Sequence, residues 1–493
     1  MTAVMVIGAG PAGLAAAASA LRHGATVTLV DASDRLGGQY WRRRAANGPQ
    51  HPSHGSARFD ALRATLETDD RCRILTGATV WAIESAGSAV ESAEGERVPA
   101  RPVVHLLVGE PDGRARTRIT LTPDTLVIAT GAYDRTLPFA GWDLPGVYTA
   151  GAAQALVKGD GVAIGRRVVV AGTGPFLLPV AESLLSAGST VVGVFEASTT
   201  RTLIGNWLAR PWQLLRSPAK ALELLRYAVA LVRHRVPCSA GSVVVRASGT
   251  DRIESVTIAR ANVDWTAIAG TERTIPVDAL CVGHGFSPRL EIAIAAGCDI
   301  VDGFVVVGDD QQSRAPGVYA AGEITGIGGV DLALAEGQLA GALAAGATPT
   351  DPSLRGARRR RAVARSFARR LDAAHGIRQG WQEALTPDTV ICRCEETTHG
   401  RLREAFEATG AASFRSLQHS TRVGLGICQG RVCGRSAEEI VASWRNDSAA
   451  SDSAASDPAA SDPAASIPEF SSDRRPIATP IRLAELAGKD TDD

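Results

Sequence analysis

The chain opens with the stretch AVMVIGAGPAGLAAAASALRHG at residues 3–24, in which an apolar run leads into glycines and then into an alanine-rich segment. Gly8, Gly10 and Gly13 stand in the pattern G-x-G-x-x-G. In a strand–turn–helix unit the first glycine permits the tight turn, the second lets the backbone approach a pyrophosphate, and the third lets helix and strand pack closely. The free N–H groups at the start of the helix then face the phosphates. The stretch therefore predicts a dinucleotide-binding unit.

Asp31 supports this interpretation because it follows the next apolar run, TVTLV at residues 26–30. A carboxylate at the end of the second strand accepts hydrogen bonds from an adenosine ribose. The opening stretch also lacks the positively charged segment of a secretory signal and carries glycines at motif spacing, so we interpret it as folded structure.

A second glycine turn, VVVAGTGPF at residues 168–176, indicates a second unit of the same kind. Gly172 and Gly174 begin the motif, but Leu177 stands where the third glycine is expected. Glu196 closes the following strand, and an acid there favours NAD or another adenine nucleotide over NADP. Leu177 should push the helix away from the sheet, so a nucleotide-binding fold without a bound nucleotide is the alternative.

The alternation of β-branched runs with helical stretches predicts an α/β fold with parallel sheets over residues 1 to about 350. Residues 355–371 are basic and predict a helical connector, whose run Arg358–Arg361 we expect on a solvated face. The repeat SDSAASDPAASDPAAS should be disordered, because small polar residues and proline bury too little apolar surface. The apolar residues after it are expected to dock back onto a folded surface.

These features predict a sequence of domains. A first dinucleotide-binding domain comprises residues 1–150 and 280–350, and a second is inserted at 151–279. The basic connector at 351–387, a cysteine-containing domain at 388–445 and a disordered linker with a C-terminal tail at 446–493 complete the chain.

Composition excludes some function classes. Lys plus Arg and Asp plus Glu both number 52 in 493 residues, and no basic stripe is interleaved with aromatics, so we expect no nucleic-acid partner. No apolar run reaches the roughly 18 residues of a membrane span, although peripheral association with a membrane stays open. Four of the eight cysteines are scattered singly, which is typical of a reduced cytoplasm and argues against dithiol chemistry.

The other four cysteines form two pairs. Cys392 and Cys394 lie in VICRCEETTHG, and Cys428 and Cys433 lie in GLGICQGRVCGRS. Zinc sites usually space their paired ligands by two to four residues, so a one-residue gap is unusual for zinc. In extended chain, residues i and i+2 point to the same side and can converge on one metal centre. Four thiolates complete a 2Fe–2S cluster; zinc and a metal-free segment are the alternatives.

Residues 203–235 carry Trp, Leu and Arg at helical spacing. We expect them to pack on their own domain, and an interface with a partner is the alternative, because Trp and Arg are favoured in interface cores.

Three further segments carry a resemblance. GGQYWR, LVIATGAYDR and GVYAAGEITGIGG together resemble the two-dinucleotide-domain flavoproteins that include thioredoxin reductase and glutathione reductase. The resemblance implies a glutathione-reductase-type fold with FAD at the N-terminal site. It also implies that a flavin is bordered by Gly38, Gln39, Thr130, Gly131, Gly322 and Glu323. Glu323 stands where that family has an aspartate on the ribityl chain.

The cysteine segment resembles the bacterioferritin-associated-ferredoxin-like 2Fe–2S domain, whose second pair is spaced more closely. With it, nearly the whole chain looks like the flavoprotein subunit of heteromeric amino-acid dehydrogenases. Relatives are the A subunit of opine oxidase, the B subunit of hydrogen cyanide synthase, D-hydroxyproline dehydrogenase and the α subunit of sarcosine oxidase. This family implies NAD or ATP as other occupants of the N-terminal site and FMN at a subunit interface. It also implies two partners, a D-amino-acid-oxidase-like FAD subunit together with a small ferredoxin-like 2Fe–2S subunit.

The expected function is electron transfer from a substrate flavin, through the 2Fe–2S cluster, in an enzyme that oxidises amino-acid C–N bonds. A stand-alone NADH-dependent reductase and a non-enzymatic iron–sulfur scaffold or sensor are the alternatives. No catalytic residue stands out, since the family places the substrate site on the partner.

Overall fold

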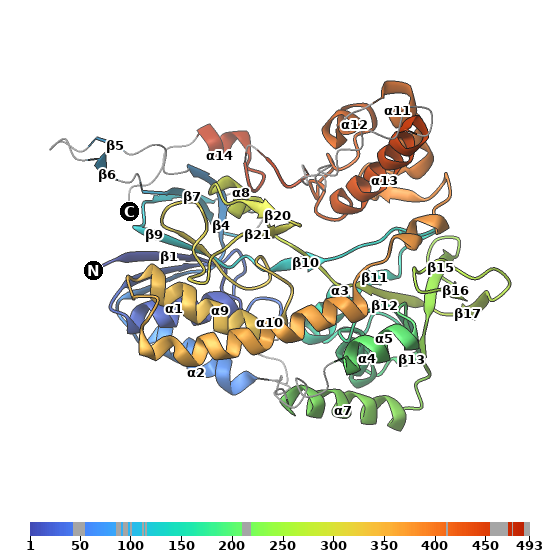
Figure 1. Ribbon diagram of the computed structural model, residues 1–493, viewed down its shortest axis with the longest axis horizontal. Helices are drawn as coiled ribbons and strands as arrows, with labels where there is room; N and C mark the ends of the chain where they lie inside the picture. Colours follow the sequence, from blue (N-terminus) through green and yellow to red (C-terminus); the bar gives the residue numbers. More distant parts are fainter. Residues whose placement is uncertain are drawn as a thin grey trace.

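The structure is a computed structural model of the chain. It describes residues 1–42, 55–84, 90–91, 97–98, 101–110, 113, 116–209, 218–410, 413–453, 472–475 and 477–487. The expected α/β fold is confirmed: two parallel sheets lie side by side, and a helical segment stands at one end (Figure 1).

The first parallel sheet has five strands in the order β22-β9-β1-β2-β3. Its strands are β1 (Ala3–Ile7), β2 (Thr26–Val30), β3 (Cys72–Leu75), β9 (Thr125–Ile128) and β22 (Val318–Ala320). The helices α1 (Pro11–Arg22), α2 (Ser56–Glu67) and α9 (Gly329–Ala344) accompany it. Strand β22 joins this sheet from far along the sequence, as the split first domain predicts.

Helices α1 and α9 approach each other closely because glycine and alanine line their contact. A Cβ atom on Gly337 would lie 2.0 Å from the carbonyl oxygen of Ala12, and one on Gly341 would lie 2.0 Å from that of Ala16. The alanine-rich composition of α1 therefore serves helix packing, and it holds the first glycine turn rigidly beside β22.

The second parallel sheet has the order β11-β18-β12-β13-β14. Its strands are β11 (Val147–Thr149), β12 (Arg167–Thr173), β13 (Thr190–Glu196), β14 (Cys238–Ala240) and β18 (Ala279–His284). This sheet extends beyond the predicted insertion at 151–279, since β11 precedes it and β18 closes it. The reason is that β18 pairs in parallel with both β11 and β12.

Helices and smaller sheets surround the second sheet. Its helices are α3 (Ala150–Ala155), α4 (Leu177–Ser186), α5 (Thr200–Leu208) and α7 (Pro218–Arg233), and a π-helical turn spans Leu156–Asp160. An antiparallel sheet packs beside it, formed by β15 (Ser242–Ser248), β16 (Ser255–Arg260) and β17 (Arg273–Pro276). The two domains are joined by the antiparallel pair β10 (Ala132–Asp134) and β19 (Phe286–Pro288).

The first domain carries shorter elements above its sheet. They are β4 (Ala78–Glu84), β7 (Val103–Val108) and β8 (Thr117–Leu121) in one antiparallel sheet, the pair β5 (Val90–Glu91) and β6 (Arg97–Val98), α8 (Glu291–Ala295), and the pair β20 (Ile300–Val301) and β21 (Phe304–Val305).

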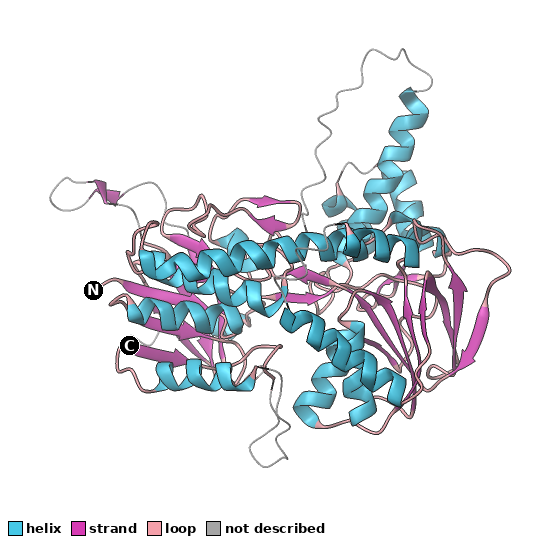
Figure 2. Ribbon diagram, turned by 60° about the horizontal axis from the view of Figure 1, so that its bottom comes forward, coloured by secondary structure: helices cyan, strands magenta, loops and turns pink. Residues whose placement is uncertain are grey.

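The basic connector forms one long helix, α10 (Arg355–His375), preceded by a 3-10 turn at Pro352–Leu354. It runs along both nucleotide-binding domains (Figures 1 and 2). The expectation of a solvated Arg358–Arg361 run is wrong for Arg361, which is 7 % exposed. This side chain is drawn inward by carboxylate, carbonyl and amide oxygens of the first domain.

The cysteine segment follows a 3-10 turn at Gln379–Ala384. It is built from β23 (Val390–Cys392), β24 (Thr397–Thr398), α11 (His399–Thr409), α12 (Phe414–Thr421) and α13 (Gly434–Ser453). Helix α13 extends eight residues, 446–453, into the predicted linker, because alanine favours helix there and the first proline comes only at Pro458. Residues 454–471 of that linker lie outside the described residues.

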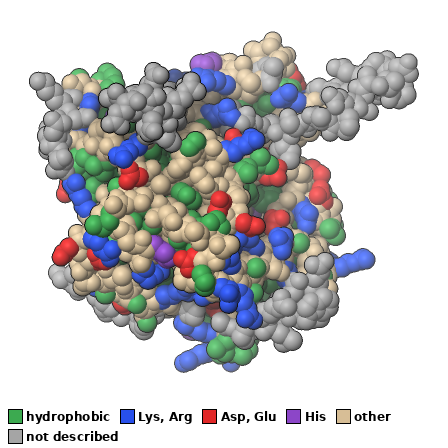
Figure 3. All heavy atoms as spheres, turned by 60° about the vertical axis from the view of Figure 1, so that its left-hand side comes forward, with side chains coloured by type: hydrophobic (Ala, Val, Ile, Leu, Met, Phe, Trp, Pro, Cys, Tyr) green, Lys and Arg blue, Asp and Glu red, His purple; other side chains and the backbone are tan. Residues whose placement is uncertain are grey.

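The C-terminal tail docks back, as expected. Ala478 donates its backbone N–H to the carbonyl of Trp81 at 2.8 Å, and Arg116 pairs with Glu485 of α14 (Leu483–Ala487) at 2.7 Å. None of the described helices is both long and apolar enough to cross a membrane. On the face shown in Figure 3, basic and acidic side chains of the described residues are interspersed, in keeping with the balanced net charge.

Candidate nucleotide and iron–sulfur sites

The structure gives a different explanation for each of the three glycines of the first motif. Gly8 has φ +105°, and a Cβ there would lie 2.3 Å from the carbonyl oxygen of Ala129; a Cβ on Gly13 would lie 1.7 Å from that of Gly8. The fold itself therefore requires both. Gly10 has φ −75°, and no atom of the described residues, apart from those next to it in the chain, lies within 4 Å of its Cβ position. Neither conformation nor packing requires a glycine there, so the open space above Gly10 fits a phosphate-bearing ligand.

Asp31 lies beside this turn. Its carboxylate accepts backbone hydrogen bonds from Ala9 at 2.5 Å and Ser33 at 2.7 Å. Gly38 packs against the turn as well, since its Cβ would lie 2.9 Å from the Cα of Gly10. The structure thus brings together Gly8, Gly10, Gly13, Asp31 and Gly38, and the neighbouring Gln39 is half-buried.

Thr130 and Gly131 lie at the end of β9. The Thr130 hydroxyl donates to the carbonyl of Arg289 at 2.8 Å, and Gly131 has φ +75° with open space at its Cβ position. Both residues therefore stand where the chain passes from β9 into β10, between the two domains.

Glu323 points toward the start of α9. Its Oε1 accepts the backbone N–H of Gly329 at 2.9 Å. Burial raises the pKa of this carboxyl to about 7, and the hydrogen bonds from Gly329 and Gly328 oppose that rise. The extra methylene of glutamate lets the carboxylate reach this helix terminus, and its predicted contact with a flavin stays a prediction.

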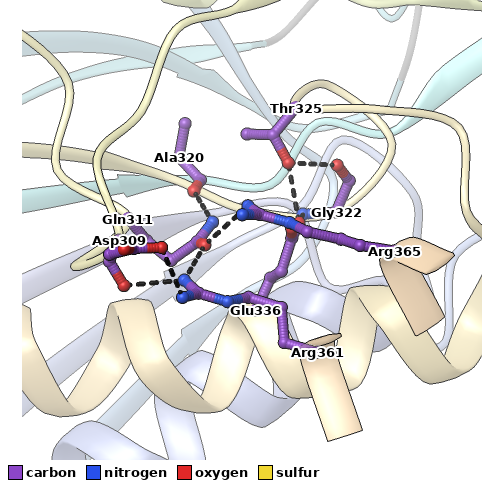
Figure 4. A network of polar contacts seen from close by, with 8 residues as sticks. All are labelled: Asp309, Gln311, Ala320, Gly322, Thr325, Glu336, Arg361 and Arg365. Carbon is purple, nitrogen blue, oxygen red and sulfur yellow. Dashed lines mark hydrogen bonds and ion pairs between the residues drawn. The ribbon is translucent and has the colours of Figure 1, made fainter. Parts of the chain in front are cut away.

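Gly322 is held by a buried network from α10 (Figure 4). The carboxylate of Glu336 accepts the backbone N–H of Gly322 at 3.1 Å and pairs with Arg365 at 2.9 Å. Arg361 donates to Gln311 at 2.8 Å, and Gln311 donates to the carbonyl of Ala320 at 3.0 Å. The connector helix therefore fixes the predicted flavin-side segment through two arginines.

The second glycine turn is arranged differently from the first. Gly172 has φ +132° and a Cβ position 1.9 Å from the carbonyl oxygen of Gly283, while Gly174 has φ +95°. Conformation alone thus accounts for both glycines. Leu177 is buried, with Cδ2 3.2 Å from the Cβ position of Gly283.

Glu196, predicted to bind a ribose, is fully engaged by its own chain. Its carboxylate accepts hydrogen bonds from the Gly174 N–H at 2.8 Å, the Thr173 hydroxyl at 2.9 Å and the Ser198 N–H at 2.9 Å. His375, the last residue of α10, places Nδ1 3.2 Å from the same carboxylate. Burial alone would raise the pKa of Glu196, but the His375 ring and the backbone donors lower it below its ordinary value.

Trp207 of α5 holds the His375 ring that covers Glu196. Its indole Nε1 donates to Nε2 of His375 at 3.1 Å, and Nδ1 of the same ring faces Glu196. Arg370 of α10 in turn donates to the carbonyl of Trp207 at 2.8 Å. His375 of α10, held by Trp207 of α5, therefore lies beside the acid of the second turn.

The four paired cysteines interact with one another. The thiol of Cys433 contacts those of Cys392 and Cys428, and Cys428 contacts Cys394. The hydrogen bond from Cys433 lowers the pKa of Cys392 to about 6, with further N–H donors from Gly424, Glu395 and Cys394. Such a cradle of amides around thiolates is what an iron–sulfur cluster requires.

A 2Fe–2S cluster needs two cysteines at each iron. The contacts between Cys392, Cys394, Cys428 and Cys433 fit that requirement.

One residue of the cysteine loop was not among the predicted site residues. Arg431, between Cys428 and Cys433, donates to the Tyr133 hydroxyl at 2.9 Å and pairs with Glu291 at 2.7 Å. Its position between two candidate ligands could have marked Arg431 as a site residue in the sequence. No local pattern marks its partners Tyr133 and Glu291, or His375 and Trp207, because only tertiary packing brings these residues together.

The fold and these sites define a class, the two-domain nucleotide-binding flavoproteins, here extended by an iron–sulfur module. The family model of the pyridine nucleotide-disulphide oxidoreductases matches residues 2–337, and that of the BFD-like [2Fe-2S] binding domain matches residues 390–443. The chain belongs to the pyridine nucleotide-disulphide oxidoreductase family, in a branch that carries this 2Fe–2S domain.

Curated relatives cover most of the chain. The A subunit of opine oxidase from Rhizobium meliloti is 33 % identical over 98 % of this chain and 87 % of its own. The HcnB subunit of hydrogen cyanide synthase from Pseudomonas protegens is 32 % identical over 87 % of this chain and 89 % of its own. The α subunit of sarcosine oxidase from Corynebacterium is 30 % identical over 70 % of this chain but only 32 % of its own.

A solved structure supports the fold. The L-proline dehydrogenase of P. horikoshii superimposes with a TM-score of 0.64 and 19 % identity, covering 99 % of this chain and 79 % of that one. The predicted family resemblance is thus confirmed: this chain is an oxidoreductase-family flavoprotein with a 2Fe–2S domain.

Proposed function

We propose that this chain is the electron-transfer flavoprotein subunit of a heteromeric dehydrogenase that oxidises a C–N bond of an amino acid. The observation that carries the proposal is the contrast between the two glycine turns. The Cβ positions of Gly10 and Gly174 are both open, but the acid of the second turn, unlike Asp31, is also engaged by a side chain, His375, which Trp207 holds in place. A self-sufficient NADH reductase would need the second site accessible, so the contrast favours an electron-transfer subunit.

The chain's own residues would hold the cofactors as follows. The turn Gly8–Gly13 and Asp31 would bind FAD, or NAD or ATP, with Gly38, Gln39, Thr130, Gly131, Gly322 and Glu323 on the flavin side. Cys392, Cys394, Cys428 and Cys433 would ligate a 2Fe–2S cluster. These groups supply one- and two-electron chemistry when bound. Gly172, Gly174 and Glu196 would maintain the fold of the second nucleotide-binding domain, which would hold no bound nucleotide.

Arg431 has a positioning role in this proposal. It lies in the cysteine loop, and its guanidinium contacts Tyr133, two residues beyond Gly131. The loop of the cluster is therefore fastened to the strand that follows the predicted flavin turn, which keeps the two redox sites at a fixed separation.

The partners would be the D-amino-acid-oxidase-like FAD subunit together with the small ferredoxin-like subunit, with FMN at a subunit interface. The named relatives are themselves subunits, which supports an assembly of this kind.

Helix α7 offers a surface for contact with a partner subunit. Its outward side chains Leu222, Leu225, Val229 and Val232 are 58–76 % exposed. The polar Glu223 and Tyr227 bond to each other on its half-buried side.

This distribution is the reverse of an ordinary surface helix, whose apolar stripe faces the core. Within the range 203–235, residues 210–217 lie outside the described residues; of the others, Leu231 packs on its own domain, Trp207 packs on α10, and the outward stripe of α7 is exposed. An apolar stripe left in water favours a partner that covers it.

We also propose that the assembly is cytoplasmic. The domain boundaries are proposed as predicted, except that the second nucleotide-binding domain is widened to residues 147–284.

Co-expression tests the function. The isolated chain should not reduce a dye with opines, sarcosine, hydroxyproline or glycine, because the family resemblance places the substrate site on the partner subunit. Co-purification with the D-amino-acid-oxidase-like subunit should restore turnover with one of these substrates. Substantial turnover by the isolated chain would relocate the substrate site to it, and rapid flavin reduction by NADH would favour the reductase instead.

A further inference from the structure

The loop of the paired cysteines has two different sides. Cys392 is fully buried and Cys433 is 3 % exposed, and Arg431 extends from the same side to Tyr133 and Glu291 of the first domain. Cys394, in contrast, is exposed. One side of the loop therefore faces the nucleotide-binding domain and the other faces solvent.

Apolar side chains are exposed on the cysteine loop. Ile427 is 91 % exposed, the highest value among the large hydrophobic side chains of the described cysteine segment, and Leu425 and Val432 are 40 % and 38 % exposed. Gly426, between the first two, packs on Cys394, since its Cβ would lie 2.2 Å from the Cβ of that cysteine. Leu425 and Ile427, which flank this glycine, and Val432, which precedes Cys433, are exposed on the cysteine loop, and we name these three residues the apolar collar.

The collar carries no net charge. Residues 423–430 hold no ionisable side chain other than the Cys428 thiol. At its border, Arg422 is paired with Glu395 at 2.6 Å, and Arg431 turns inward. Protein interfaces are depleted of charge at their core and apolar there, and the collar has this composition.

We propose that the apolar collar is the docking surface for an electron-carrier protein, which accepts electrons from the cluster at the edge marked by Cys394. The proposal rests on the proposed electron-transfer function and adds the place where electrons leave the chain. In each event one electron passes from the reduced cluster to the oxidised centre of the carrier. No bond forms or breaks, and no proton is transferred.

The size and charge of the collar favour this occupant over others. Three side chains bury far less than the roughly 1,000 Å² that a stable dimer of this chain needs, whereas transient redox encounters use small interfaces. A lipid surface would call for unpaired basic groups beside the apolar ones, and the arginines next to Cys394 and the collar in the sequence are engaged by their own chain: Arg393 lies over the Trp142 ring, and Arg422 and Arg431 are paired. The side facing Tyr133 is occupied by the chain's own domain, so we assign the collar side of the cysteine loop to another redox protein.

The test compares the full chain with the variant Leu425→Ser/Ile427→Ser, with the cluster reduced anaerobically by dithionite. The probes are oxidised cytochrome c, which must dock, and ferricyanide, which need not. We expect the second-order rate with cytochrome c to fall at least tenfold, while the rate with ferricyanide and the electron paramagnetic resonance spectrum of the cluster stay the same. Binding of redox-inactive zinc cytochrome c, followed by fluorescence, should weaken by a similar factor.

The matched control is Leu483→Ser on α14, because Leu483 is 83 % exposed and lies beside the Arg116–Glu485 pair of the first domain. This variant should behave as the unaltered chain. Unchanged cytochrome c rates in the collar variant would overturn the proposal, as would a failure of the unaltered chain to bind or reduce the carrier while it reduces ferricyanide. Absence of a reducible cluster would instead refute the proposed function.

Discussion

Arg431 and Glu291 form an ion pair of 2.7 Å across the boundary between the cysteine loop and the first nucleotide-binding domain. Glu291 is 6 % exposed and the Arg431 side chain 18 % exposed. Arg475 also approaches Glu291, at 3.9 Å, so removing Arg431 deprives the buried carboxylate of its shorter ion pair. This contact therefore joins the two redox modules energetically as well as geometrically.

The first prediction concerns this pair. Arg431→Met should lower the free energy of unfolding by about 3 kcal/mol at most, because the buried Glu291 then keeps only longer contacts, with Arg475 at 3.9 Å and the Tyr133 hydroxyl at 3.4 Å. The double variant Arg431→Met/Glu291→Leu should recover most of the loss, as an apolar pair of similar volume replaces the ions. Urea unfolding measures both. Arg403→Met, which breaks an exposed pair with Glu407, is the control and should cost less than about 1 kcal/mol. Equal stability of all three variants would show that the contact contributes nothing.

The second prediction separates the glycines of the first motif. Gly10→Val should empty the N-terminal site and leave the stability of the ligand-free protein within about 1 kcal/mol, since the added Cβ meets no atom of the described residues beyond those next to it in the chain. Gly13→Val should instead lower the free energy of unfolding by several kcal/mol, because it collides with the carbonyl of Gly8. Chromatography of the adenine nucleotide released on denaturation, beside thermal unfolding, measures both. A Gly10→Val protein that retains its nucleotide would contradict the phosphate role.

The third prediction tests the cluster ligands. The unaltered chain, purified anaerobically, should contain two irons and two acid-labile sulfides. Cys394→Ser should bleach its visible absorption, because serine supplies a harder ligand and this thiol is the exposed one. Cys238→Ser, at an exposed cysteine far along the chain from both pairs, should change neither iron nor sulfide. One zinc per chain and no sulfide would favour the zinc alternative.

The fourth prediction addresses α7. Leu225→Glu/Val229→Glu should abolish co-purification with the D-amino-acid-oxidase-like subunit, because two charges would have to be buried in an apolar contact. The isolated variant should fold and remain more soluble than the unaltered chain. Val263→Glu is the control, since Val263 and Val229 are both 58 % exposed. Undiminished co-purification of the double variant would place the partner elsewhere.

The sequence predicted the parts of the sites that depend on local pattern. The strand–turn–helix around Gly8 and Gly13 follows from backbone contacts that only glycine permits. The helical connector followed from its composition. The pairing of Cys392 and Cys394 with Cys428 and Cys433 followed from spacing, and the contacts between their thiols fit it.

What it could not predict depends on distant packing. Arg361 was expected in solvent, because a basic run resembles a solvated face until Asp309 and Gln311 are brought beside it. The reach of Arg431 to Glu291 needs the cysteine segment seated on the first domain. The contact between His375 and Glu196 depends on where α10, a helix of 21 residues, ends, and no local pattern specifies that position.

The last prediction concerns that contact. His375 lies 3.2 Å from Glu196 and accepts a hydrogen bond from Trp207, so a nucleotide ribose would have to compete with the anchored His375 ring for the carboxylate. The unaltered chain should therefore bind NADH weakly and show no rapid flavin reduction by it. The variant His375→Ala/Trp207→Ala removes the cover while Gly174 and Ser198 still orient the carboxylate. Its affinity for NADH, measured by calorimetry, should rise at least tenfold, and NADPH should bind more weakly because Glu196 repels a 2′-phosphate. Phe176→Ala, at a side chain that packs beside the second turn and is not part of the cover, serves as the control for nonspecific loosening. Tight NADH binding by the unaltered chain would show that the cover does not close the site and would support the reductase alternative.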